Sequence, residues 1–141
     1  MTYAVSGLTA EPFAPLFSMD EEALTARGAR RMVADAPLGF PCRVSLDDAR
    51  PGETLILINY EHQPAPTPFR ASHAIFVREG VSPVRTVDEM PPALRRRLLS
   101  LRGFDDSGMM RAADITQGAT ADQLIETMFE DPAIAYLHAH Y

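Results

Sequence analysis

The chain has 141 residues, and its 13 basic side chains are all arginine, against 19 acidic ones, which gives a formal net charge of −6 at pH 7. The absence of lysine excludes the phosphate-binding P-loop and the Schiff-base enzymes, which both depend on a lysine amine. The acidic balance argues against a nucleic-acid partner, because such proteins neutralise phosphates with basic patches.

Short elements separated by turn signals are predicted for the first part of the chain. Ser18 and Glu21 have the spacing of a capping box, and Gly28 provides a C-terminal stop, so a helix is predicted between them. The run from Leu55 to Ile58 is apolar on both faces, which is typical of a central strand covered on both sides. The predicted elements are a strand at 2–6, a helical turn at 11–17, a helix at 19–26, and strands at 29–35 and 54–60.

The rest of the chain alternates strands and helices without a strict order. Capping-box spacings recur at Thr86 with Glu89 and at Thr120 with Gln123, and Pro92 can occupy the first turn of a helix. The predicted elements are a loop at 61–71, a strand at 72–79, a helix at 92–100, strands at 101–104 and 109–115, a helix at 120–130 and a strand at 133–140. This pattern predicts a single α+β domain over residues 1–141, with a mixed or mostly antiparallel sheet of about five to seven strands and two or three helices.

Three features favour a cytoplasmic protein without a membrane partner. The single cysteine, Cys42, excludes an intramolecular disulfide and is typical of a reducing compartment. The first residues lack the basic and apolar regions of a signal peptide, and the longest aliphatic run is far too short for a membrane span.

Several motifs from residue 40 to near the end of the chain resemble one known family. They are Phe-Pro-Cys-Arg at 40–43, Asn-Tyr-Glu-His-Gln at 59–63, the run from Pro68 to Glu79, and Asp131-Pro132 with Tyr-Leu-His at 136–138. Together they are similar to a bacterial family of small proteins catalogued as domain of unknown function 1203. The resemblance implies a stand-alone bacterial cytoplasmic protein and implies no activity. Members of that family continue into a short end with glycine and cysteine, whereas this chain stops at Tyr141.

The loop at 61–71 is the first candidate for a functional site. Prolines at 64, 66 and 68 favour an extended course that costs little entropy to order around a ligand. If the flanking strands pair as a hairpin, their polar ends meet at one edge of the sheet, and these ends carry Asn59, Glu61, His62, Arg70 and His73. The alternative is a stiff surface loop whose polar flanks bond to its own backbone.

Cys42 and Arg43 form the second candidate, because a guanidinium beside a thiol can lower its pKa and activate it as a nucleophile. His62 or His73 could then act as the base, and Asn59 could orient it. The alternative for Cys42 is a small buried hydrophobic residue. Arg43 and Arg70 could hold a small anionic molecule by paired hydrogen bonds, or form salt bridges with nearby glutamates instead.

His138 and His140 form the third candidate, since residues two apart on a strand share a face. They could supply two metal ligands, with His62 or His73 and Glu61 completing the set. No HExxH or paired Cys-x-x-Cys motif is present, and histidines on a half-buried strand are more often structural. The sequence therefore assigns no metal ligand, and it identifies no cofactor.

The preferred interpretation is a small-ligand-binding domain that could also be catalytic, with its site at the strand ends, where concave sites usually form. The predicted catalytic residues are Cys42, His62 and His73, and the predicted ligand-binding residues are Arg43, Asn59, Glu61, Arg70 and His138. The alternatives are a non-enzymatic homodimer or partner-binding module and a histidine-based metal-dependent enzyme.

Overall fold

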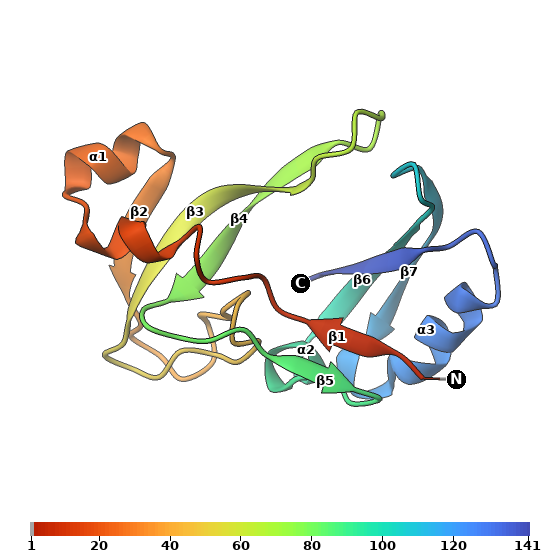
Figure 1. The fold of residues 1–141 in the computed structure, drawn as a ribbon. Helices are drawn as coiled ribbons and strands as arrows, with labels where there is room; N and C mark the ends of the chain where they lie inside the picture. Colours follow the sequence, from red (N-terminus) through yellow and green to blue (C-terminus); the bar gives the residue numbers. More distant parts are fainter. Residues whose placement is uncertain (1) are drawn as a thin grey trace. The chain divides into compact units, whose positions relative to one another are not determined.

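The computed structural model describes residues 2–141, which form eight strands, three α-helices and two short 3-10 helices. In chain order these are β1 (Ala4–Ser6), η1 (Ala14–Ser18), α1 (Glu21–Ala26), β2 (Ala29–Val33), β3 (Thr54–Gln63), β4 (Ala71–Arg78), β5 (Arg85–Val87), α2 (Pro92–Arg95), β6 (Leu98–Phe104), β7 (Met110–Gln117), η2 (Gly118–Thr120), α3 (Asp122–Phe129) and β8 (Tyr136–His140). Figure 1 follows them along the chain.

The strands form three sheets, in the orders β1-β5, β2-β3-β4 and β7-β6-β8. The pairs β2–β3, β6–β7 and β6–β8 are antiparallel. The predicted α+β class is therefore confirmed, although the strands divide among three sheets instead of one. Within residues 2–141, no helix is long and apolar enough to cross a membrane.

The described residues divide into two compact units. One, here called the β2 unit, consists of residues 6–60 and 73–85; the other, the β6 unit, consists of residues 2–5, 61–72 and 86–141. Both contain segments that lie far apart in the sequence. The strand β3 changes unit at its end, since its last three residues, 61–63, belong to the β6 unit.

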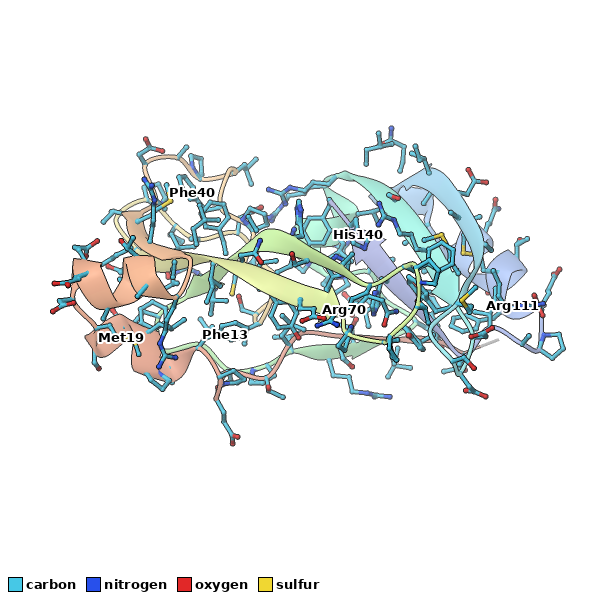
Figure 2. All side chains as sticks on the ribbon, turned by 90° about the horizontal axis from the view of Figure 1, so that it is seen from above. Phe13, Met19, Phe40, Arg70, Arg111 and His140 are labelled. Carbon is cyan, nitrogen blue, oxygen red and sulfur yellow. The ribbon has the colours of Figure 1, made fainter. Side chains whose placement is uncertain are left out.

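The β2 unit is built around β3, the middle strand of its sheet. Leu55 and Ile56 are both fully buried, and because successive side chains on a strand point to opposite faces, each face carries its own apolar cluster. Ile56 belongs to the cluster that contains Phe13, whereas Leu55 packs in the cluster that includes Phe40. Figure 2 shows these two phenylalanines on opposite sides of the β3 ribbon. The prediction of a central strand covered on both faces is confirmed for this part of β3.

The β6 unit has the sheet β7-β6-β8 at its centre. Leu99 and Leu101 of β6 alternate with half-buried Ser100 and Arg102, so one face of this strand supplies core side chains. The helix α3 buries Ile125 and Met128 on one stripe that also includes half-buried Leu124 and Phe129. The opposite face of β6 is therefore the one available for polar chemistry.

Several predicted boundaries are corrected by the structure. The loop predicted at 61–71 is confirmed only for residues 64–70, since β3 continues to Gln63 and β4 starts at Ala71. The helix predicted at 92–100 ends at Arg95, because the residues from Leu98 onward pair with β7 and β8. The cap of α1 is Asp20, whose carboxylate accepts the Ala23 N–H at 2.8 Å, and not Ser18.

Candidate functional site

Two histidines of the site are positioned by β8. Ile134, Tyr136, His138 and His140 alternate with alanine and leucine, and this period of two places the aromatic rings on one face of the strand. The register with β6 is fixed: Phe104 lies opposite Tyr136, Arg102 opposite His138 and Ser100 opposite His140. Pairing with β6 therefore holds both imidazoles on the polar face of this sheet.

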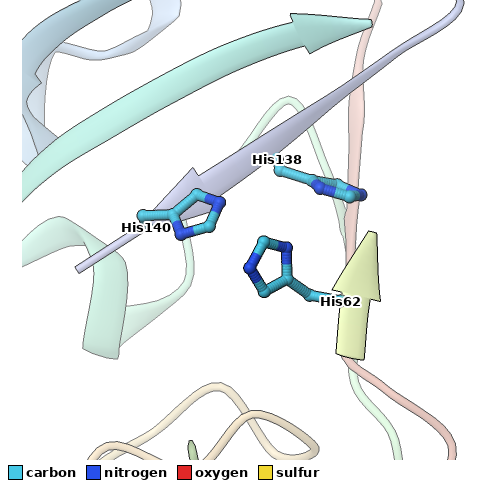
Figure 3. A group of neighbouring side chains, drawn as sticks. All are labelled: His62, His138 and His140. Atoms are coloured by element: carbon cyan, nitrogen blue, oxygen red, sulfur yellow. The ribbon is translucent and has the colours of Figure 1, made fainter. Parts of the chain in front are cut away.

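The third histidine, His62, is the second-last residue of β3. It lies in the part of that strand that belongs to the β6 unit. Figure 3 shows its ring facing those of His138 and His140. The ring centroid of His62 lies 4.6 Å from that of His140 and 5.8 Å from that of His138. One nitrogen of each ring lies within 4.8 Å of the others, so the three form a compact group, here called the histidine cluster.

Aromatic packing and one hydrogen bond hold the cluster together. Buried Phe104 stacks on Tyr136, with ring centroids 5.5 Å apart and an interplanar angle of 20°, and its centroid lies 5.1 Å from that of His138. Gln63, almost fully buried, donates from Nε2 to the Tyr136 hydroxyl at 2.8 Å. Since Gln63 follows His62 directly, this bond ties the end of β3 to β8 beside the cluster.

The surroundings of His138 favour its neutral imidazole. Burial lowers the pKa of His138 below its ordinary value, and the nearby His62 and Arg102 lower it further. The Nδ1 atom of His138 is buried, and no described residue within 2–141 hydrogen-bonds to it. A neutral imidazole with an available nitrogen is the form that binds a metal ion.

The dimensions of the cluster are close to those of a metal site. A four-coordinate zinc ion with bonds of about 2.0–2.1 Å holds neighbouring ligand nitrogens about 3.4 Å apart. The nitrogens of the cluster lie within 4.8 Å of one another, so a closure of at most about 1.4 Å would bring them to that spacing. Rotation of the rings about their side-chain bonds is sufficient for a movement of this size. Among the described residues no carboxylate or thiolate belongs to the group.

The predicted site residues do not all lie in this unit. His62 and His138 are brought together, whereas Cys42, Arg43, Asn59 and His73 belong to the β2 unit. Cys42 is fully buried, and its sulfur accepts backbone N–H groups of Val44, Ser45 and Arg78 at 3.3–3.4 Å. These surroundings are those of the small buried residue that the sequence offered as the alternative.

The remaining predicted residues are accounted for by structural contacts or by exposure. Glu61 accepts a 2.5 Å hydrogen bond from Nε of Arg70, so this pair forms the salt bridge offered as the alternative to an anion site. Asn59 and Glu61 are exposed and alternate with half-buried Tyr60 and His62, so the two exposed side chains point away from His62. Arg43 donates from Nη1 to the carbonyl of Pro41 at 3.3 Å.

Arg102, Gln63 and Tyr136 also surround the cluster, and the sequence did not indicate them. Nothing in the sequence connects Tyr136 with Gln63. Arg102 becomes relevant only through the register of β6 with β8, which the sequence does not specify.

Comparison with known proteins gives a family without an activity. No curated protein and no solved structure matches the chain. The model of one family, described as a protein of unknown function (DUF1203), matches residues 39–141, a range that includes the whole histidine cluster. The chain therefore belongs to the DUF1203 family.

Proposed function

We propose that this protein binds one transition-metal ion, most suitably Zn²⁺, through His62, His138 and His140. The observation that carries the proposal is the convergence of three imidazoles, from two strands distant in the sequence, to within 4.8 Å. Three imidazole nitrogens grouped at this spacing can serve as ligands of one metal ion. This function is the metal-dependent alternative offered by the sequence, and the homodimer alternative stays a prediction.

Zinc is the favoured ion because of the ligand type. Imidazole binds zinc, copper, nickel and iron, whereas magnesium and calcium require oxygen ligands, which the cluster lacks. Three protein ligands on a tetrahedral ion leave a fourth position for water or substrate. Such an ion can polarise a bound oxygen or lower the pKa of a bound water towards neutrality, which is the basis of metal-assisted hydrolysis and hydration.

Metal titration of protein purified without a histidine tag tests the proposal. A chromophoric zinc chelator competes with the protein, and the stoichiometry and dissociation constant follow from the displacement curve. We expect one equivalent to bind to the wild type. His62→Ala, His138→Ala and His140→Ala should each weaken binding by at least about tenfold to a hundredfold, since even residues that only support ligands contribute that much.

His73→Ala is the matched control, because His73 is the remaining histidine of the chain and does not belong to the cluster. It should bind zinc with wild-type affinity. Binding that is lost equally in the control, or that survives all three substitutions in the cluster, would overturn the proposal.

A further inference from the structure

Arg102 is the charged side chain that the fold places next to the histidine cluster. It lies on β6 directly opposite His138 on β8, and residues directly opposite in an antiparallel pair share a face of the sheet. The side chain is half-buried.

Two other arginines of the β6 unit have anionic partners. Arg70 pairs with Glu61, and Arg111 pairs with Asp131 at 3.4 Å and Asp105 at 4.0 Å. Within residues 2–141, Arg102 forms no ion pair. A half-buried guanidinium is most stable when an anion accepts its hydrogen bonds.

The charge of a metal-loaded cluster also favours an anion beside Arg102. Three neutral imidazoles leave the full charge of a divalent ion uncompensated, and no carboxylate of the described residues belongs to the group. Arg102 adds another positive charge on the same face. A site with this balance favours an anion at its open position over a neutral ligand.

We propose that the metal centre takes a small oxyanion, with one oxygen on the metal and another accepting hydrogen bonds from the Arg102 guanidinium. Carboxylate and phosphate groups share this chemistry, since both match the planar fork of arginine with paired oxygens. The inference rests on the metal site proposed above and names its ligand class. It moves the predicted anion-binding role from Arg43 and Arg70 to Arg102.

Cobalt-substituted protein tests the inference, because the visible absorption of Co²⁺ changes when its open position is filled. Untagged protein loaded with one equivalent of Co²⁺ is titrated with acetate and, in a separate arm, with inorganic phosphate. We expect at least one of the two anions to give a saturable change in absorption. The anion that saturates at the lower concentration shows whether the site prefers a carboxylate or a phosphate. Arg102→Gln should weaken that anion by about tenfold or more, and Arg102→Lys should weaken it less, because it keeps the charge but not the fork.

Arg111→Gln is the control, since it removes the same charge from the neighbouring strand β7 and should leave anion affinity unchanged. The Co²⁺ affinity of Arg102→Gln is measured alongside and should equal or exceed that of the wild type, because a cation near the metal has been removed. A loss of Co²⁺ affinity in this variant would instead make Arg102 a structural residue and overturn the inference.

The two proposals fail differently. If the wild type does not bind Co²⁺ or Zn²⁺, the metal site itself is wrong. If the metal binds and neither anion changes the spectrum, or if Arg102→Gln binds them as the wild type does, only the oxyanion inference is overturned.

Discussion

The three candidate ligand atoms of the histidine cluster are all imidazole nitrogens. The sequence predicted only part of this grouping. The shared face of His138 and His140 followed from the period of a strand, and it is observed in β8. The ring of His62 could not be placed, because the proline-rich segment after it predicted a loop where β3 continues to Gln63. Contacts between distant strands depend on register, and nothing local in the sequence sets it.

A second group of charges in the β2 unit allows a pH prediction at the same scale. Glu53 accepts the backbone N–H of Arg50 at 2.6 Å and two-pronged hydrogen bonds from Arg78 at 2.8–3.1 Å. The backbone hydrogen bond from Arg50, followed by the bonds and charge of Arg78, lowers the pKa of the Glu53 carboxyl. Both side chains of the ion pair are mostly buried, with 29% of Glu53 and 18% of Arg78 exposed.

Glu53→Gln should lower the free energy of unfolding at pH 7 by about 1 kcal/mol, since hydrogen bonds to a charged group are lost at a partly screened site. The folded-state pKa lies below the unfolded value of about 4.3, so the contribution is complete above that value. It is lost as the pH falls through the folded-state pKa. Urea unfolding should therefore show a constant difference from wild type between pH 6 and 8 and a shrinking one below pH of about 4.3.

Glu79→Gln provides the control, because this substitution removes the same charge from an exposed position at the end of the same sheet. It should change stability little at any of these pH values. A pH-independent difference for Glu53→Gln would mean that the pair contributes packing and no charge interaction.

At the scale of elements, the spacing of residues in the sequence predicted the presence of helices more accurately than the residues at which they begin and end. Three capping boxes were predicted, yet α3 begins without a side-chain cap, and the Thr86 hydroxyl donates to the carbonyl of Glu89 at 2.6 Å. The start of α3 is set by the preceding η2, where the Gly118 N–H donates to the Arg97 carbonyl at 2.8 Å. Tertiary packing thus overrode the local motif, and the spacing of a capping box contains no information about that packing.

The contact of η2 with α2 yields the prediction for this scale. A Cβ added at Gly118 would lie 1.8 Å from the carbonyl oxygen of Leu94 and 2.9 Å from that of Arg97. Both are backbone atoms, so the two elements would have to move apart. Gly118→Ala should therefore lower the free energy of unfolding by about 3 kcal/mol or more.

Gly39→Ala is the matched control, since a Cβ at that position meets nothing within 4 Å. It should stay within about 0.5 kcal/mol of the wild type in the same denaturant titration. Equal stability of the two variants would show that η2 does not pack on α2 in solution.

At the scale of the molecule, composition and periodicity predicted the α+β class but not the division into units. The predicted site joined Cys42 and His73 to His62 and His138, and these two pairs belong to different units. The division could not be foreseen, because each unit combines segments separated by many residues. The four predicted residues share a chemical type and a place near strand ends. Neither property determines the order of the strands.

Because all three cluster histidines belong to the β6 unit, metal binding should stabilise that unit selectively. Free Zn²⁺ at a hundred times its dissociation constant should add about 2.7 kcal/mol and raise the melting temperature by roughly 8 °C. The increase should disappear on addition of a chelator and in His62→Ala, and it should persist in His73→Ala.

Hydrogen exchange locates the effect within the molecule. Zinc should slow the exchange of amides in β8 and at the end of β3, since a bound ion joins these segments, while α1 and β2 should exchange as in the metal-free protein. This contrast separates a site in the histidine cluster from weak binding at scattered acidic side chains, which would change both units alike. Equal protection of both units, or a melting shift that survives in His62→Ala, would contradict the placement of the metal.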